Sequence, residues 1–537
     1  MATATTDDRT APREGKGTRF RFGPPDWGWI GPLIVAAYAF VVVFVRLGDP
    51  HELMWDETYY AKDAWALLHS GVELSWRDQP GGQPANGFVM AGNPAAGLHH
   101  GAAGFAVHPP VGKWLIAAGV AVFGMDPFGW RVAAAAAGVL LVLIVARTAR
   151  RMLGSTPLGC AAGLLVALDG SWLVAARISM LDIFLALFVV AGFGCLVVDR
   201  DRTRAALAAH AEGPGPGVFG PLLWRPWRIA AAVCFGLACG SKWTGLYALV
   251  FFWALALLWD RGARKAAGVS RPWTGTVLLD LLPSFLTVGA VALATYLAGW
   301  WGWFVSGTGL QERLFGRTIA GAERFWAKEN PSAFWPEFLD PLRSLWHRHA
   351  ETLAFHRGVT GTHPSQSWPW EWLYLGRPAG MHFQTHQSGG AGCTPSDQCV
   401  TGVTDLGTPA IWWAAPAALA ILFVLTIRAW DWRAGAVLWG YLAGFLPWLP
   451  EAAGGRIMFS TYALPLLPFA ALALVLLYAK AAEAAEGRPA RRTLVYLAGA
   501  AYLGAVAGNF WYLYPVLTAD LIPYSSWSSR MWLPGWR

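Results

Sequence analysis

Apolar runs of about 20 residues recur along almost the whole chain, and this feature constrains the fold most. A helix needs roughly 20 such residues to cross the hydrocarbon core of a bilayer. Charged residues make up 14% of the 537 residues and hydrophobic residues 55%, whereas a soluble domain carries roughly 25% charged residues. The pattern excludes a soluble protein and predicts an all-α polytopic membrane protein with about 11 transmembrane helices.

The formal net charge is +8, but the basic residues gather at the ends of apolar runs, where they set topology. Binding of nucleic acid is therefore not expected. The strongest basic clusters are RTARR, DRDRTR and DRGARK at 147–151, 199–204 and 260–265, and we place all three on the cytoplasmic side. This requires 111–125 to be a short non-spanning or re-entrant segment and 228–259 to be two helices that meet at Ser241 and Lys242. In the alternative topology, each of these two segments is a single span.

The topology divides the chain into four regions. Residues 1–26 are polar and basic and lack the apolar stretch of a signal peptide, so we expect a cytoplasmic tail. Residues 27–300 form a transmembrane module that contains a first extracytoplasmic loop at 48–110. Residues 301–408 form a large extracytoplasmic loop, and 409–537 form a four-helix transmembrane region with an external tail.

Ionisable side chains collect on one face of this predicted arrangement. Such residues are costly at membrane depth and usually functional. A single one, such as Arg131, could equally be a charge that sets topology, but a set on one face indicates a site. The set lies at or just within the outer face and contains Asp56, Glu57, His108, Lys113, Arg131, Arg177, Asp182, Lys242 and Arg456.

The acidic pair Asp56-Glu57 directly follows the first apolar run, within MWDETYYA. The pair could cap the amphipathic helix that we expect next, because Asp and Glu favour the first turn of a helix. Alternatively, a carboxylate here could remove a proton from an attacking hydroxyl group.

Five stretches give the sequence a recognisable order. They are WDETYYAKDA (55–64), VHPPVGKWLIA (107–117), ARISMLDIFLALF (176–188), GLACGSKWTGLYAL (236–249) and GGRIMFSTYALPLLPF (454–469). With them the chain resembles the protein O-mannosyltransferases, which are polytopic enzymes of the GT-C class. HPSQSWPWEWLYLGRP (363–378) resembles a sixth stretch, from the family's large loop.

The resemblance implies a GT-C fold with two large extracytoplasmic loops. It also implies transfer of mannose from polyprenyl-phosphate mannose to Ser or Thr hydroxyls of exported proteins, with inversion, at the plasma membrane and beside the protein translocon. Asp56 and Glu57 are then the catalytic pair. The large loop is too short for the β-trefoil module of the eukaryotic members, so the chain is similar to the bacterial form. A related GT-C enzyme that acts on a lipid or cell-wall glycan is the alternative.

A phosphate leaving group needs cationic stabilisation as its charge develops. Lys242 is the first candidate, because SKW interrupts an apolar run, and Arg131 and Arg177 follow. His108 and Lys113 could also hold phosphate, although a structural turn at Pro109-Pro110 explains His108 equally well. Asp182 and Arg456 are expected to support the site.

The large loop supplies candidates for contacts with the sugar or the acceptor. Trp368 and Trp370 could stack on either, or belong to an interfacial aromatic belt, and His363 begins the same stretch. Cys393 and Cys399 predict a disulfide, because we place this loop in the outer compartment, which permits one. A Cys-based metal site is the alternative, although the spacing lacks a second pair. The histidine pairs of this loop do not complete a ligand set. We therefore expect no required metal and no cofactor besides the lipid-linked donor.

Overall fold

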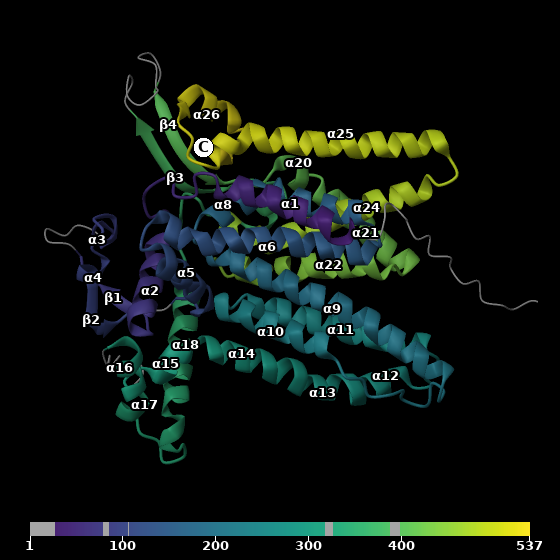
Figure 1. Ribbon diagram of the computed structural model, residues 1–537, viewed down its shortest axis with the longest axis horizontal. Helices are drawn as coiled ribbons and strands as arrows, with labels where there is room; N and C mark the ends of the chain where they lie inside the picture. The colour runs from purple at the N-terminus through teal and green to yellow at the C-terminus, as the bar shows by residue number, and fades with distance from the viewer. Residues whose placement is uncertain (1–26, 79–84, 106, 317–325, 387–397) are drawn as a thin grey trace, which may run out of the picture.

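The computed structural model describes residues 27–78, 85–105, 107–316, 326–386 and 398–537 (Figure 1). Its long helices run side by side, as expected for a multi-pass membrane protein. Within the described ranges, seven helices are long and apolar enough to cross a membrane, or up to eight if the bent pair α7 (Thr156–Ala167) and α8 (Gly170–Arg177) is one span. The membrane class is confirmed, whereas the count of about 11 stays a prediction.

The first part of the bundle is built from helices that alternate in direction (Figure 1). The longest, α9, packs extensively against α10 and also contacts α6. The span at Pro272–Gly299 contains two π-helical stretches, η1 and η2, on either side of Pro283. These elements are α1 (Trp27–Phe44), α6 (Pro127–Leu153), α9 (Leu181–Glu212), α10 (Pro226–Ser241), α11 (Gly245–Ala266), α12 (Pro272–Thr276), η1 (Val277–Leu281), α13 (Leu282–Ser284), η2 (Phe285–Ala290) and α14 (Val291–Gly299).

The helix boundaries agree with the arrangement that places the basic clusters together. Helix α5 (Val111–Phe123) has 13 residues and ends at Gly124, whose φ of +94° suits a residue without a side chain. Asp126 then caps α6 by accepting a hydrogen bond from the Gly129 amide at 2.7 Å. The chain therefore turns back on the side where α5 began (Figure 1). Because α10 and α11 are separate helices with Lys242 between them, residues 228–259 do not form the single continuous helix that the alternative topology requires.

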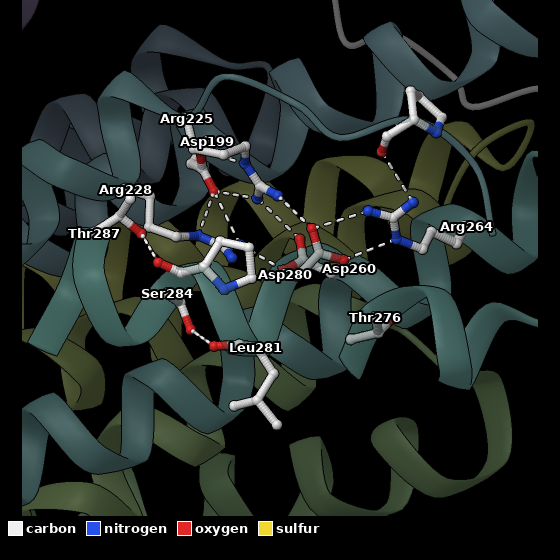
Figure 2. A network of polar contacts seen from close by, with 12 residues as sticks. Asp199, Arg225, Arg228, Asp260, Arg264, Thr276, Asp280, Leu281, Ser284 and Thr287 are labelled. Atoms are coloured by element: carbon white, nitrogen blue, oxygen red, sulfur yellow. Dashed lines mark hydrogen bonds and ion pairs between the residues drawn. The ribbon is translucent and has the colours of Figure 1, made fainter. Parts of the chain in front are cut away.

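The two ends of the bundle differ. The first and large loops lie at one end, on the left of Figure 1, which we call the loop end. The three basic clusters lie at the other end. There, Asp199, Asp260 and Asp280 pair with Arg225, Arg228 and Arg264 in a buried network (Figure 2). Part of the charge expected to face water therefore joins α9, α10, α11 and η1 instead.

The first loop begins with the predicted amphipathic helix, α2 (Glu57–Ser70). The described residues 85–103 contain short elements: α3 (Asn86–Met90), α4 (Pro94–Gly97) and β2 (Leu98–Ala103), which pairs with β1 (Leu74–Trp76). The strand β1 precedes α3 and β2 follows α4, so their pairing brings the chain before and after these two helices together beside α2.

The large loop is mixed rather than wholly helical. Its strands β3 and β4 form an antiparallel sheet with β5 from the C-terminal tail, so the tail ties back onto the loop. Its elements are α15 (Trp301–Val305), α16 (Gly309–Phe315), α17 (Trp326–Glu329), η3 (Glu337–Leu339), α18 (Asp340–Gly358), α19 (Pro369–Trp372), β3 (Ala379–His386) and β4 (Cys399–Asp405), and β5 is Ile522–Pro523.

The C-terminal region adds further helices to one side of the bundle. Helix α25 lies at its margin, with 11% of its most apolar stretch buried. The elements are α20 (Pro409–Trp412), α21 (Ala415–Ala429), α22 (Trp432–Phe445), α23 (Trp448–Ala453), η4 (Ser460–Leu466), α24 (Leu467–Ala484), α25 (Pro489–Leu513), η5 (Tyr514–Val516), α26 (Tyr524–Arg530) and η6 (Pro534–Trp536).

Candidate functional site

A cavity of about 590 Å³ lies at the loop end and is lined by residues of α10, α11, η2, α14, α18, α23 and η4. This volume lies in the range of small-molecule sites, roughly 300–1,000 Å³. One part is polar, with His108, Lys242, His356, Arg357, Glu451, Arg456 and Tyr462 in its wall. The other part is apolar and lies between spans, with Leu246, Leu249, Gly289, Ala292 and Leu293. The cavity can therefore hold a molecule with an anionic head and an apolar tail.

Lys242 supplies a positive charge where α10 gives way to α11. Its Nζ atom lies 2.8 Å from Oδ1 and 3.0 Å from Oδ2 of Asp182, in the first turn of α9. The same ammonium lies 4.3 Å from the centre of the Tyr462 ring. Asp182 therefore holds the lysine in place, while Lys242 still borders the cavity.

Asp56 immediately precedes α2 and lies close to this cationic wall. Its Oδ2 atom accepts a hydrogen bond of 3.2 Å from the Tyr60 hydroxyl, and the Tyr60 ring contacts the ring of His108 in the cavity wall. Burial raises the pKa of Asp56 to about 6, although the charge of Lys242 and the Tyr60 hydrogen bond oppose this effect. The carboxylate is thus a stronger base than an ordinary aspartate.

The backbone beside Asp56 is strained. Trp55 has a φ of +47°, in the left-handed region that side chains other than glycine's rarely adopt. Such conformations cluster at functional sites and persist where the surroundings enforce them. The Trp55 ring packs edge-on against His363 and Phe459, which helps to fix this turn.

Glu57 is fully buried and fully engaged, in contrast to Asp56. Its carboxylate accepts two hydrogen bonds from Arg131, at 2.8 and 2.9 Å. It also accepts backbone bonds from Met54 at 3.0 Å and Ser179 at 3.1 Å. With its oxygens occupied in this way, Glu57 is poorly placed to take a proton, so the two members of the acidic pair differ in their chemistry.

Arg131 has no exposed surface and does not line the described cavity wall. Besides Glu57, its guanidinium donates to the carbonyl groups of Leu47, Pro50 and Glu52. These carbonyls belong to the segment between α1 and Asp56. The arginine predicted as a phosphate ligand therefore lies beneath the turn that presents Asp56.

Arg177 and Lys113 are also engaged away from the cavity. Arg177 donates to the carbonyls of Val43, Val45 and Arg46, at and just after the end of α1. Lys113 lies between two carboxylates, 2.8 Å from Asp63 and 3.2 Å from Glu73. Neither contact leaves the cation directed at a phosphate in the cavity.

His108 and Arg456, in contrast, both reach the cavity. The His108 ring stacks on His356, and a guanidinium nitrogen of Arg456 lies 3.5 Å from Nδ1 of His356. Burial and the charge of Lys242 hold the pKa of His108 well below its usual range, and burial also lowers that of His356. Both rings are therefore neutral near pH 7, and the positive charge comes from Lys242, Arg357 and Arg456.

Some cavity residues escaped the sequence analysis. Tyr462 lines the cavity and Tyr60 bonds to Asp56, and both lie inside the stretches that carry the family resemblance, so those stretches were an available signal. His356 and Arg357 end helix α18, in a part of the large loop that matched no assigned stretch. The sequence offered no pattern there that indicates contact with the transmembrane module.

The predicted contacts of the large loop lie on the side of the Asp56 turn. His363 packs against Trp55, whereas Trp368 and Trp370 stack on each other with ring centres 5.5 Å apart. Trp370 is half exposed. His363 therefore lies at the Asp56 turn, while the two tryptophans form a separate aromatic surface.

The disulfide and metal predictions remain partly outside the described structure. Cys399 is disulfide-bonded, but its predicted partner Cys393 lies outside the described residues. Among the described residues, no group of three or more His, Cys, Asp or Glu side chains could hold a metal ion. The absence of a required metal stays a prediction.

Two family descriptions match the chain. Residues 98–297 match "Dolichyl-phosphate-mannose-protein mannosyltransferase", and residues 341–536 match "C-terminal four TMM region of protein-O-mannosyltransferase". Together the two matches cover more than half of the sequence and include the segments that form the cavity.

Similar proteins match over nearly full length. A polyprenol-phosphate-mannose–protein mannosyltransferase of Mycolicibacterium smegmatis (strain MKD8) is 38% identical, over 96% of this chain and 95% of that protein. A protein of the same name from Mycobacterium tuberculosis (strain ATCC 25618 / H37Rv) is 39% identical, over 96% and 94%. The structure of the S. cerevisiae Pmt1-Pmt2 complex bound to the sugar donor matches with a TM-score of 0.68 at 12% identity, over 95% of this chain and 92% of that chain.

The predicted GT-C fold is confirmed by this structural match, and the relatives extend the resemblance to the sequence as a whole. With identities above 30% over nearly the full length, the chain belongs to the protein O-mannosyltransferase family.

Proposed function

We propose that the chain transfers mannose from polyprenyl-phosphate mannose to Ser or Thr hydroxyls of exported proteins, with inversion and with Asp56 as the general base. The observation that carries this proposal is a basic carboxylate close to a cavity with a cationic part and an apolar part. The names of the relatives support a protein acceptor over the alternative of a lipid or cell-wall glycan.

The cavity suits a lipid-linked donor in its two parts. The prenyl chain would lie along Leu246, Leu249 and Leu293, on helices that face the membrane interior. The phosphate would lie near Lys242, Arg357 and Arg456, whose charges stabilise the anion as the glycosidic bond breaks. His108 and His356, as neutral rings, would contribute hydrogen bonds rather than charge.

The chemistry requires one displacement. Asp56 removes the proton of the acceptor hydroxyl as its oxygen attacks the anomeric carbon, and the bond from that carbon to the phosphate oxygen breaks. The phosphate leaves with the electron pair of that bond, so no sugar–enzyme intermediate is needed. General-base assistance of this kind contributes about 10²–10⁴-fold.

Four of the remaining candidates contact other parts of the protein rather than the substrates. Glu57 and Arg131 hold the turn that presents Asp56, Arg177 fixes the end of α1 that leads into it, and Lys113 braces α2 against α5. These are positioning residues.

For the acceptor, His363 is the best placed contact because it packs on Trp55. Trp368 and Trp370 offer a stacking surface farther along the same loop.

The proposal also assigns the regions and the side of the membrane. Residues 27–300 form the catalytic module, 301–408 the large extracytoplasmic loop, and 409–537 the C-terminal four-helix region, after the cytoplasmic tail 1–26. The positive-inside rule puts the basic end in the cytoplasm, so the site works on the outer face of the plasma membrane, where polypeptides emerge from the translocon.

A transfer assay tests the function. Purified full-length protein in lipid vesicles would receive radiolabelled polyprenyl-phosphate mannose and a Thr/Pro-rich peptide, and the label on the peptide would be measured. Label on the peptide is the expected result. Label on an added lipid or glycan acceptor, with none on the peptide, would favour the alternative GT-C activity instead.

Substitution of Lys242 should impair use of the donor more than use of the peptide. In Lys242→Met the cation is lost, so we expect kcat/KM for the donor to fall by about 10²-fold or more, as for removal of one electrostatic contact in a transition state. A matched variant, Lys480→Met, removes a partly exposed lysine that pairs with Asp431 and Glu483 away from the cavity and should change transfer little. Equal losses for donor and peptide in Lys242→Met would contradict the phosphate assignment.

The pH profile should report the titration of Asp56. The base works only when deprotonated, and its pKa is raised to about 6. The logarithm of kcat/KM should therefore rise with unit slope below pH 6 and level off above it. A profile that stays flat down to pH 4.5 would show that an ordinary, exposed carboxylate or no carboxylate acts as the base.

Cysteine labelling tests the orientation. Gly213 lies exposed at the basic end and Gly380 exposed at the loop end, and both have space for a side chain. In intact cells, a membrane-impermeant maleimide should label Gly380→Cys and not Gly213→Cys, relative to the unsubstituted chain. The reverse pattern would put the site in the cytoplasm.

A further inference from the structure

Exposed aromatic side chains gather where the large loop reaches away from the bundle. Phe334 is 81% exposed, Phe338 79% and Trp346 78%, and Trp335 and Leu342 are also exposed. We call residues 334–346 the aromatic arm; it comprises the start of α18 and the segment before it. Clusters of exposed large apolar side chains usually mark a surface that another apolar body covers.

The other side of α18 is attached to the protein. Arg348 donates to the Gly104 carbonyl at 3.1 Å and lies over the Phe105 ring, and Trp303 donates to the Pro341 carbonyl at 3.0 Å. Ser344 and Leu345 are buried on this side. The helix is thus fixed in its rotation, and the exposed aromatic face has a definite direction.

The position of the cavity shows in which direction the aromatic face of α18 points. Leu342, Trp346, His349 and Leu353 share one face of α18, because they recur at spacings of four, three and four residues. His349 and Leu353 line the cavity, and His349 bonds to Tyr296 on α14. The same cavity is lined by Leu246 and Leu293, exposed side chains of membrane-spanning helices. The face that carries Trp346 therefore looks toward the layer occupied by the spans.

The long axis of α18 runs across the ends of the spans rather than along them (Figure 1). A helix with this orientation lies in the plane of the membrane surface. Amphipathic helices in that position bury their apolar face about 5–10 Å into the boundary between headgroups and acyl chains. Tryptophan is enriched at that boundary, because its ring is apolar and its N–H group is polar.

We propose that the aromatic arm is a membrane-surface anchor, whose partner is the lipid leaflet at the loop end of the bundle. Phe338, Leu342 and Trp346 insert between the lipids, while Glu351, on the opposite side of α18, faces water. The anchor holds the α18 wall of the cavity at the level of the headgroups. This inference concerns lipid contact alone and does not depend on the proposed transfer reaction.

Spin labels on full-length protein in liposomes test the anchor. One label would be attached at Trp346→Cys and the matched control at Glu351→Cys, both on exposed positions that tolerate a new side chain. Molecular oxygen concentrates in the bilayer, and a nickel chelate stays in water. The label at 346 should collide with oxygen several-fold more often, relative to nickel, than the label at 351. The described part of the chain contains free cysteines, which could also take up the label. The signal of the unsubstituted protein is therefore subtracted.

Two results would overturn the proposal. Equal and high collision rates of both labels with nickel would put the arm in water. Low rates with both oxygen and nickel at 346, together with dipolar broadening that disappears on dilution with unlabelled protein, would show that a second copy of the chain covers the arm. Phe338→Cys repeats the measurement at a second exposed position of the aromatic arm, so a local disturbance at 346 would not decide the outcome.

Discussion

Asp56→Asn should abolish most of the transfer activity while leaving the protein inserted and folded. The amide has nearly the shape of the carboxylate but cannot take the proton of the acceptor hydroxyl. We expect kcat to fall by about 10²–10⁴-fold, the usual contribution of a general base. The KM for the donor should change little, because Lys242 and Arg456 remain in the cavity wall. The measurement is mannose transfer to peptide by purified protein in lipid.

The control for this variant is Asp49→Asn, in the same segment between α1 and α2. Asp49 is about half exposed and pairs with the exposed side chain of Arg46. Exposed pairs of this kind contribute about 0–1 kcal/mol, so transfer by this variant should stay close to that of the unsubstituted chain. Unchanged turnover of Asp56→Asn, or equal losses in both variants, would remove Asp56 from the role of base.

The sequence predicted the path of the chain well because the path depends on local features. Basic clusters at 147–151, 199–204 and 260–265 indicated the topology, and the structure agrees, with α5 turning back and Lys242 separating two helices. The pairing of Lys242 with Asp182 was not predicted, although both residues were named. Depth in a membrane can be inferred from a sequence, but the direction of a side chain depends on distant partners.

Arg131 and Arg177 show that limit. Both were predicted to hold phosphate, because an arginine near the membrane face indicates function. Their partners are carbonyl groups of residues 43–52, more than 70 positions earlier in the chain. Nothing in the local sequence distinguishes an arginine that binds a ligand from one that fixes a turn. The functional inference concerned the region as a whole and did not resolve the contacts of each cation.

The large loop shows the converse limit. His356 and Arg357 reach the cavity from α18, which packs against the first loop through Arg348 and against α14 through His349. These contacts join parts of the chain that are about 50 to 250 residues apart, so no periodic pattern in the sequence predicts them. When a site lies between a loop and a membrane module, sequence analysis identifies only the residues that the membrane module contributes.

Arg131→Gln should destabilise the protein strongly, because it leaves the Glu57 carboxylate buried without a counter-charge. Both side chains of the pair have no exposed surface. Breaking a buried pair costs about 3–5 kcal/mol, and the turn that presents Asp56 should loosen as the bonds to residues 47–52 are lost. The free energy of unfolding would be measured in mixed micelles by titration with SDS, beside the transfer rate.

The double variant Glu57→Gln/Arg131→Gln separates this role from the role predicted by the sequence. Without the buried carboxylate, the neutral pair should regain part of the lost stability, so that the two losses are not additive. If Arg131 instead held the phosphate, Arg131→Gln would weaken donor use at unchanged stability, and Glu57→Gln would not restore anything. Partial recovery of stability with no recovery of transfer would be consistent with an Asp56 turn that needs the charged pair for its position. The contrast between the two observables therefore assigns Arg131 either to the turn or to the donor.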